Sequence, residues 1–477
     1  TSVVLSYVCF AKIFQSRRAG LLCSALYSLT IYRLLILYLK DHLGQTTAMA
    51  LLPLLMYAIW RLLETDPKAP EYRRTWIFLT LGETVLIQCH VLTCELALVF
   101  GILVFLCNLR KVIRIRTLLE LAKSTAMTLL LNAWFLVPFL QYYEAEKLNI
   151  TNPELYTRTI QSQGASIPML LGLLQFAGHS DNTIDQGLLG AMPFTLGAAL
   201  LLGVIVLCVL LLYGERSKAL SLSLFGAAFG LLSLWMASAL FPWDALQTLG
   251  GVIARLVSAL QYPTRLLEVS TLFLCLCAGG VYVHLEQRGD GKRALYFGGC
   301  SAAAAILLST LFLNGLLETS PLYRIYDAHA MGNAYLSGRE YLPVGTDENA
   351  LLAGTYICED GVNMTETLKQ GTTIVMQVEN TVNDARAIEV PLLYYSGYQA
   401  IDKEGNALPL SYGTQQVIRV TVPAGYAGEI RIAFVSPLSW RVAEVLSLLS
   451  WIFFLGKLWI DRKKRIPDGQ AWRTQSE

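Results

Sequence analysis

The chain has 477 residues, of which 54% are hydrophobic and only 15% are charged, and its formal net charge is +2. Soluble globular domains carry about 25% charged residues, so this composition indicates a membrane protein and excludes an ordinary soluble enzyme. Nucleic-acid binding requires clustered positive charge. The near-neutral balance therefore gives no reason to expect a nucleic-acid partner, and the partner that composition predicts is the lipid bilayer.

Apolar runs of membrane-spanning length recur along the chain. About 20 residues, rising 1.5 Å each, cross a hydrocarbon core of about 30 Å. The two runs between 76 and 109 are the least secure, because only a short polar group separates them. The sequence predicts eleven transmembrane helices, at 1–15, 19–39, 47–63, 76–92, 94–109, 117–140, 187–213, 219–240, 266–286, 294–316 and 442–460.

The connections between these runs alternate in charge. The basic ones read QSRR, RLLETDPKAPEYRR, RKVIRIR, GERSK, EQRGDGKR and DRKKR, and they hold most of the 37 Lys and Arg residues. Positively charged loops face the cytoplasm. The intervening segments are therefore expected on the outer side: 40–46, 88–95, 141–186, 241–265 and 317–441.

This topology divides the chain into four parts. Residues 1–316 form a transmembrane domain, 317–441 a mostly β extracytoplasmic domain, 442–460 a final transmembrane helix, and 461–477 a basic cytoplasmic tail. The first span must run from outside to inside, and the chain begins without an initiator methionine or a signal peptide. We therefore expect that an earlier helix and a first outer loop are missing.

The polar region before the last span has the pattern of a β domain. The stretches TTIVMQVEN, AIEVPLLYYSGYQAI and QQVIRVTVPAGYAGEIRIAFV alternate apolar and polar residues and are separated by the turn sequences DKEGNALPL and PAGYAG. Such alternation is typical of strands with one buried face. The sequence predicts an all-β sandwich of about 100 residues.

Two outer segments, 153–178 and 243–263, are apolar but interrupted by helix breakers. Segments of this kind lie along the membrane interface or enter the protein at membrane depth. One interpretation is a lateral entrance for a lipid substrate, and the other is interfacial packing alone. The sequence leaves both open.

The sequence contains no nucleotide-binding motif and no cysteine or histidine set at metal-ligand spacing. Nine of the ten cysteines lie in or beside apolar runs, with neither a CxxC pair nor a histidine cluster at metal-ligand spacing, so we interpret them as packing residues. A Walker loop, a GxGxxG after a strand and a Ser-His-Asp signature are also missing. No cofactor is predicted with any support, although a divalent metal stays possible, and a donor substrate is expected to arrive already activated on a lipid.

Arg265 is the first candidate site residue. It stands in QYPTRLL at the outer end of an apolar run, where Pro263 suits the first helical turn and fixes the helix start. A guanidinium at this depth is suited to binding a phosphate through two parallel hydrogen bonds. The alternative is an arginine that merely extends to the lipid headgroups.

Further polar residues are predicted at the same outer boundary. Another span is preceded or begun by Lys40, Asp41, His42 and Gln45. Lys40 and Arg265 would then place two cations at one depth. The alternative is that this segment is an ordinary hydrated loop. His90 and Glu95 are ionisable groups at the membrane boundary, which are costly there unless they face a cavity. His90 would then position or polarise a substrate hydroxyl, and the alternative is a histidine satisfied within the core.

An ordered series of short motifs resembles a known family. LYLKDHLGQTTAMALLPLLMY, LIQCHVLTCEL, LLLNAWFLVPFL, LQYPTRLL and VPLLYYSGYQAIDKEG occur in the order found in YfhO-type bacterial membrane proteins and the related pyruvoyl-tetrahydropterin-synthase-related membrane family. Those proteins resemble the GT-C superfamily of multi-span glycosyltransferases. The resemblance implies an inverting enzyme of the bacterial plasma membrane that moves a sugar from a polyprenyl phosphate to a cell-envelope glycan, teichoic acid or lipid acceptor.

The resemblance also implies roles for particular residues. Arg265 and Lys40 would bind the donor phosphate. An Asp or Glu that activates the acceptor is expected in the missing first outer loop, and His90 and Glu95 are further catalytic candidates. The chain departs from the family pattern at Lys40, where arginine is usual, and at Gln45, where glutamate is usual; glutamine is no general base. The remaining residues expected at the substrate cavity are Gln45, Asp41, His42, Gln261, Tyr262, Trp243 and Tyr341.

Two other functions remain as alternatives. A transporter or flippase of lipid-linked glycans would show internal repeats with matching broken helices, and we find none in the sequence. A non-catalytic envelope assembly protein is favoured by Gln45. The sequence identifies neither the sugar nor the acceptor.

Overall fold

The computed structural model describes residues 1–40, 42–145, 147–149, 160–172, 194–319, 342–347, 351 and 353–463. The chain forms two compact units. The first is helical and comprises Thr1–Thr128 with Thr157–Gly332. The second comprises Leu129–Tyr156 with Asn333–Glu477 and contains all the described strands.

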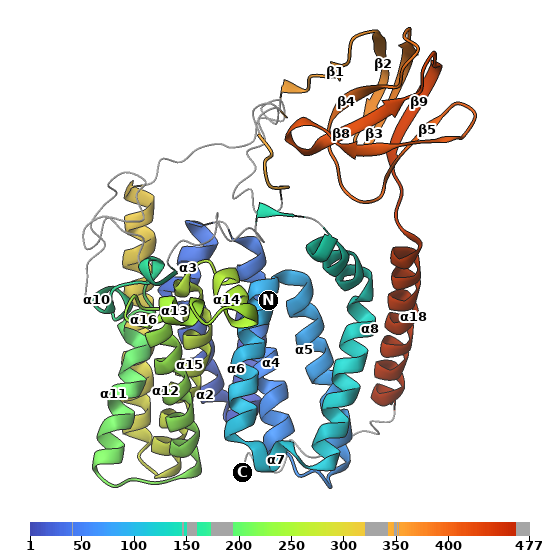
Figure 1. Cartoon of the computed structure of the whole chain (residues 1–477). Coiled ribbons are helices and arrows are strands. Elements are labelled where there is room, and N and C mark those ends of the chain that lie inside the picture. Colours follow the sequence, from blue (N-terminus) through green and yellow to red (C-terminus); the bar gives the residue numbers. More distant parts are fainter. Residues whose placement is uncertain are drawn as a thin grey trace. The chain divides into compact units, whose positions relative to one another are not determined.

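The helical unit follows the predicted apolar runs closely, because each run supplies a helix (Figure 1). Its main helices are α1 Ser2–Phe14, α2 Arg17–Ser28, α3 Ile31–Tyr38, α4 Leu43–Glu64, α5 Thr75–Cys89, α6 Val91–Cys107, the first part of α8 Ile115–Ala145, α11 Ala198–Leu212, α12 Lys218–Met236, α15 Leu267–Gln287 and α16 Gly291–Thr319. Shorter helices are α7 Leu109–Val112, α10 Ile167–Leu170, α13 Trp243–Gln247 and α14 Gly251–Ala259.

Six helices in the described part of the chain are long and apolar enough to cross a membrane, and α2 with α3, bent by 47°, make a seventh if they form one broken span. The protein is therefore a multi-pass membrane protein. The prediction of eleven spans goes further than this, because α1, α5, α6 and α11 have only 13 to 17 residues. The six are Leu43–Glu64, Ile115–Glu144, Lys218–Met236, Pro263–Gln287, Gly291–Leu317 and Leu438–Asp461.

α15 is the central helix of this unit, since it contacts α1, α2, α11, α12 and α16 (Figure 1). The apolar stretch of the span Pro263–Gln287, which contains α15, is completely buried inside the protein. Close packing against α12 depends on glycine: a Cβ placed on Gly226 would lie 2.7 Å from the carbonyl oxygen of Phe273. Small residues at such contacts let two helix backbones approach, which drives helix association in membranes.

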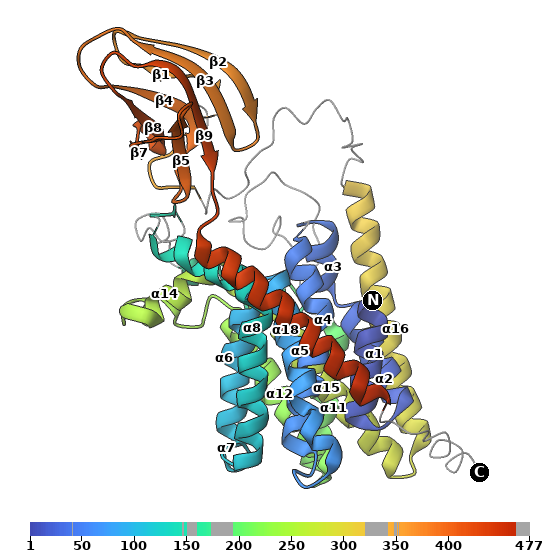
Figure 2. The ribbon, with the colours of Figure 1, turned by 90° about the vertical axis from the view of Figure 1, so that its right-hand side faces the viewer.

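The predicted β sandwich is confirmed as two antiparallel sheets that enclose one apolar core (Figure 2). One sheet has the order β1-β4-β8-β7 and the other β2-β3-β9-β5-β6. Alternation along β8, VIRVTV, buries Ile418, Val420 and Val422 and leaves the residues between them half-buried. The strands are β1 Ile357–Cys358, β2 Val362–Gln370, β3 Thr373–Asn380, β4 Arg386–Leu393, β5 Tyr398–Asp402, β6 Ala407–Leu408, β7 Leu410–Tyr412, β8 Val417–Val422 and β9 Ala427–Phe434.

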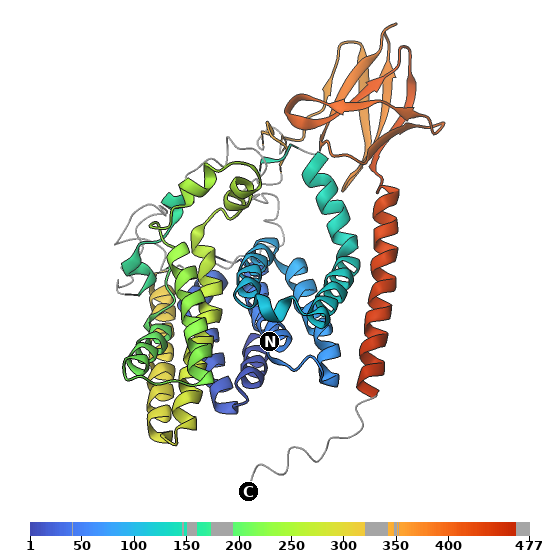
Figure 3. The same ribbon diagram turned by 60° about the horizontal axis from the view of Figure 1, so that its bottom comes forward.

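The second unit also contains the later part of α8 and the last helix, α18 Leu438–Lys463, which run alongside each other (Figure 3). Ser447 joins them: its hydroxyl donates to the carbonyl of Leu130 at 2.9 Å and accepts from the amide of Trp134 at 3.0 Å. Buried hydroxyl contacts of this kind hold apolar helices together where the hydrophobic effect between them is weak.

A candidate anion site at one end of the helical unit

Four segments at the ends of helices meet at one end of the helical unit and create a polar cluster. They are the end of α3, the start of α4, the break between α5 and α6, and the 3-10 turn Pro263–Leu266 that begins α15. Gly44, in the first turn of α4, brings two of them together, because a Cβ there would lie 2.8 Å from the carbonyl oxygen of Cys89. Only glycine permits this approach.

The turn before α15 holds Arg265 in a fixed geometry. Pro263 occupies the first position of the turn, as predicted, and Tyr262 precedes it in an extended conformation. Gln261 has a φ of 61°, which is strained for a residue with a side chain. The guanidinium of Arg265 donates to the carbonyl of Leu260 at 3.1 Å, so the arginine fastens the turn that positions it.

Lys40 and Arg265 are brought to the same aromatic ring, which agrees with the expected pair of cations. The Nζ of Lys40 lies 5.4 Å from the centroid of Tyr262, and the Cζ of Arg265 lies 5.6 Å from it. Such cation–π contacts partly compensate the removal of the charges from water. Burial, together with the nearby charge of Arg265, lowers the pKa of Lys40 to about 8.

Glu268 is the residue of this cluster that sequence reasoning missed. It lies three residues after Arg265, in the first turn of α15, and is fully buried. Its Oε2 accepts hydrogen bonds from the Nε2 of Gln45 at 3.2 Å and from the hydroxyl of Thr93 at 3.1 Å. Its Oε1 has no hydrogen-bond partner within the described part of the chain. The signal in the sequence was a carboxylate inside an apolar run, one turn after the candidate arginine.

Gln45 connects Glu268 to Tyr32 in the first turn of α3. Its Nε2 also donates to the hydroxyl of Tyr32 at 3.0 Å, and its Oε1 lies 3.4 Å from the Nδ1 of His42. Gln45 is only 2% exposed. Its amide N–H groups serve a carboxylate here, which a glutamate at the same position would instead repel. These contacts are the structural reason for a glutamine at position 45.

His90 and Glu95 lie at the edge of the same cluster. His90 interrupts the helices and caps α6, since its Nδ1 accepts from the amide of Thr93 at 3.2 Å and lies 2.8 Å from the Thr93 hydroxyl. This contact satisfies an amide that a helix start leaves without a partner. Glu95 follows in the first turns of α6 and is within electrostatic reach of Arg265.

Three predicted cavity residues lie elsewhere or outside the described residues. Trp243 begins α13, is 4% exposed and donates from its indole to the carbonyl of Met236 at 2.8 Å, with its ring centroid 4.5 Å from that of Phe241. It packs within the protein and is not part of the cation cluster. Asp41 and Tyr341 lie outside the residues that the structure describes.

The cluster favours anion binding over metal binding. Within the described residues, no group of three or more His, Cys, Asp or Glu side chains is arranged to hold a metal ion. Two cations beside a tyrosine ring instead form a site of the kind that binds phosphate, with a buried carboxylate one turn further into the helix.

The fold and this cluster define the protein as a multi-pass membrane protein with a polar, doubly cationic site at the end of its central helix. Comparisons of the chain with protein-family models, curated proteins and solved structures found no match.

Proposed function

We propose that the protein is a membrane glycosyltransferase of the GT-C type, similar to the YfhO family, which transfers a sugar from a polyprenyl phosphate to an acceptor of the bacterial cell envelope. The observation that carries the proposal is the pair Lys40 and Arg265 at the ring of Tyr262. The charge of Arg265 contributes, after burial, to the lowered pKa of Lys40, so the two cations repel each other. An anionic ligand that contacts both reduces that repulsion, and a phosphate fits their chemistry.

In the proposed reaction the bond between the sugar's anomeric carbon and the donor phosphate oxygen breaks. The electron pair goes to that oxygen, where Arg265 and Lys40 stabilise the charge that develops. The acceptor hydroxyl attacks from the opposite side and inverts the anomeric carbon, and its proton goes to a carboxylate. The family resemblance places that carboxylate in a first outer loop, and the cluster adds Glu95 as a residue close to Arg265.

The proposal includes an orientation in the plasma membrane. The basic connections favour eleven spans, with the C-terminal tail in the cytoplasm and the β domain outside. Cys358 offers a test, since it is exposed on β1. A membrane-impermeant maleimide should label it in intact cells, and Cys358→Ser should remove that label. Labelling that requires broken cells would place the β domain on the cytoplasmic side.

Sugar transfer by the purified chain in lipid nanodiscs tests the reaction. Arg265→Ala removes the hydrogen bonds to the phosphate, each contributing about 1.5–3 kcal/mol when charged, so transfer should fall about 100-fold or more. Arg265→Lys keeps the charge but loses the paired geometry and should recover only part of the rate. Arg293→Ala is the control, because that arginine is 78% exposed at the start of α16.

Two results would contradict the proposal. Transfer by Arg265→Ala at the rate of the unchanged protein removes the phosphate-binding role of this residue. Equal incorporation of labelled sugar into the envelopes of cells with and without the gene removes the glycosyltransferase function itself, and favours a transporter or an assembly protein.

A further inference from the structure

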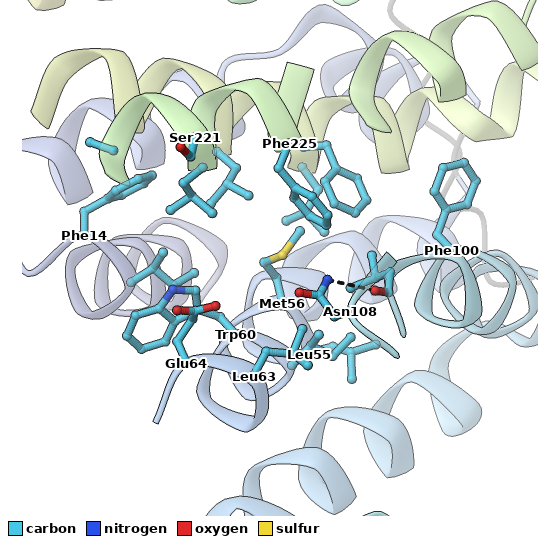
Figure 4. Close-up of a pocket in the computed structure, with 18 of the residues that line it drawn as sticks. Phe14, Leu55, Met56, Trp60, Leu63, Glu64, Phe100, Asn108, Ser221 and Phe225 are labelled. Atoms are coloured by element: carbon cyan, nitrogen blue, oxygen red, sulfur yellow. Dashed lines mark hydrogen bonds between the residues drawn. The ribbon is translucent and has the colours of Figure 1, made fainter. Parts of the chain in front are cut away.

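A large apolar groove lies inside the helical unit, among helices α1, α4, α6, α12 and α15 (Figure 4). Its volume is about 670 Å³. Most of its lining side chains are aliphatic or aromatic, and among those that point into it are Met56, Trp60, Phe100 and Phe225. Water is poorly stabilised in such a space, because it finds few hydrogen-bond partners there, whereas an apolar ligand loses only its own contact with water or lipid.

One end of the groove is lined by residues that lie close in sequence to the cation cluster. Val269 lines the groove and directly follows Glu268 on α15, while Ala97 lines it from α6, two residues after Glu95. The groove then follows α15 as far as Val283, a rise of about 21 Å for fourteen residues of helix. Arg265 lies four residues before Val269, a rise of about 6 Å, so an apolar chain whose head is held at Arg265 can enter the groove at Val269 and run along α15 beside apolar side chains.

The opposite end of the groove is polar. Glu64, Asn108, Lys218 and Gln287 line it there, at the ends of α4, α6 and α15 and the start of α12. A hydrocarbon chain that covered these side chains would remove charged and amide groups from water, which is unfavourable. The groove thus has a charged site for an anion beyond one end, an apolar middle and a polar end that limits its length.

We propose that this groove binds the hydrocarbon chain of a lipid phosphate whose headgroup is held by Lys40 and Arg265. The inference rests on the proposed function in one respect, namely that the anion at the cluster is a lipid phosphate. It adds that the chain lies inside the protein, along α15, and that the protein recognises a long chain as well as a phosphate. The polarity of the two regions matches the two parts of such a lipid, a charged head and one apolar chain.

Gly101 provides a way to fill the groove without disturbing its walls. It lies on α6, lines the groove, and a Cβ placed on it would have nothing within 4 Å. Gly101→Leu should therefore insert a side chain into the space where the hydrocarbon chain would lie. Gly299→Leu is the matched control: Gly299 is exposed on α16, does not line the groove, and also has open space around a Cβ.

The test measures binding of three probes to the full chain in detergent: geranylgeranyl phosphate, dimethylallyl phosphate and inorganic phosphate. Each buried methylene contributes about fourfold in affinity. Gly101→Leu displaces at least two carbons, so its affinity for geranylgeranyl phosphate should fall about tenfold or more. Its affinities for dimethylallyl phosphate and inorganic phosphate should not change. Arg265→Ala should weaken all three probes, and Gly299→Leu none.

Three results would overturn the inference. The first is unchanged affinity for geranylgeranyl phosphate in a Gly101→Leu protein that is folded, as judged by its thermal transition. The second is equal affinity of the unchanged protein for geranylgeranyl and dimethylallyl phosphate. The third is displacement of geranylgeranyl phosphate by phosphatidylglycerol at equal concentration, which would show that the groove takes ordinary bilayer lipid. Gly101→Ala repeats the test with the smallest added group.

The binding test and the transfer assay can refute the groove and the proposed reaction independently of each other. Binding that depends on Gly101 and Arg265 in a protein that transfers no sugar would refute the proposed reaction and leave the groove intact. Transfer from a long-chain donor that depends on Arg265 but proceeds at the unchanged rate in Gly101→Leu would refute the groove and leave the reaction intact.

Discussion

Gln45 and Glu268 form a buried hydrogen-bonded pair, and we expect a variant with both residues replaced to be more stable than the variant with Gln45 alone replaced. Gln45→Leu takes a hydrogen bond of 3.2 Å from a carboxylate that is fully buried. Removing one partner of a buried hydrogen bond leaves the other polar group without it, which costs about 1–3 kcal/mol. The free energy of unfolding should fall by about 1–3 kcal/mol.

Adding Glu268→Leu to Gln45→Leu should restore part of that loss. It removes the carboxyl group that Gln45→Leu leaves short of a partner, and Thr93, the other donor to Glu268, keeps an acceptor in the Nδ1 of His90 at 2.8 Å. Replacing both partners of a buried hydrogen bond by apolar residues can be nearly neutral. The pair therefore should not behave additively.

The assay is unfolding of the purified protein in mixed micelles, followed as a double-mutant cycle over the four proteins: unchanged, Gln45→Leu, Glu268→Leu and the double variant. The expected order places the double variant above Gln45→Leu. A double variant whose loss equals the sum of the two single losses would show that Glu268 does not depend on Gln45, and the reasoning on this cluster would be wrong.

Two further predictions concern the pH dependence of the site and the packing of the helices. Burial, and to a smaller extent the charge of Arg265, lowers the pKa of Lys40 to about 8. The affinity for phosphate should therefore decline as the pH rises above about 8. In a titration of phosphate binding against pH, Lys40→Arg should remove this decline, because arginine keeps its charge. Because the folded protein holds this proton less tightly than the unfolded chain, the stability contribution of Lys40 should rise with pH between about 8 and the ordinary value of 10.5. Gly226→Ala places a Cβ 2.7 Å from a backbone oxygen and should lower the free energy of unfolding by about 1–3 kcal/mol. Gly299→Ala is the control: its Cβ lies in open space, so it should raise the free energy of unfolding by up to about 1 kcal/mol. Similar unfolding curves for the two variants would contradict close packing at Gly226.

Among the predicted site residues, the sequence located the charged ones best. The sequence predicts Lys40 and Arg265 at one depth, because each stands at an end of an apolar run, and the structure places both at Tyr262. Position along a span fixes depth in the membrane, so residues at the ends of different spans can be grouped from the sequence alone. Trp243 is also predicted near this membrane boundary, but it packs inside the protein away from the cation cluster. Depth in the membrane does not specify which way a side chain points.

The sequence by itself determined the helical runs, the β sandwich and the polar boundary, since these depend on local periodicity and on the length of apolar segments. Only the tertiary structure showed that Glu268 joins Gln45 and Thr93 and that Val269, the next residue, lines a groove. Both depend on which faces of separate helices meet. That choice is made by long-range packing around α15, where glycines admit some neighbours closely and leave space beside others.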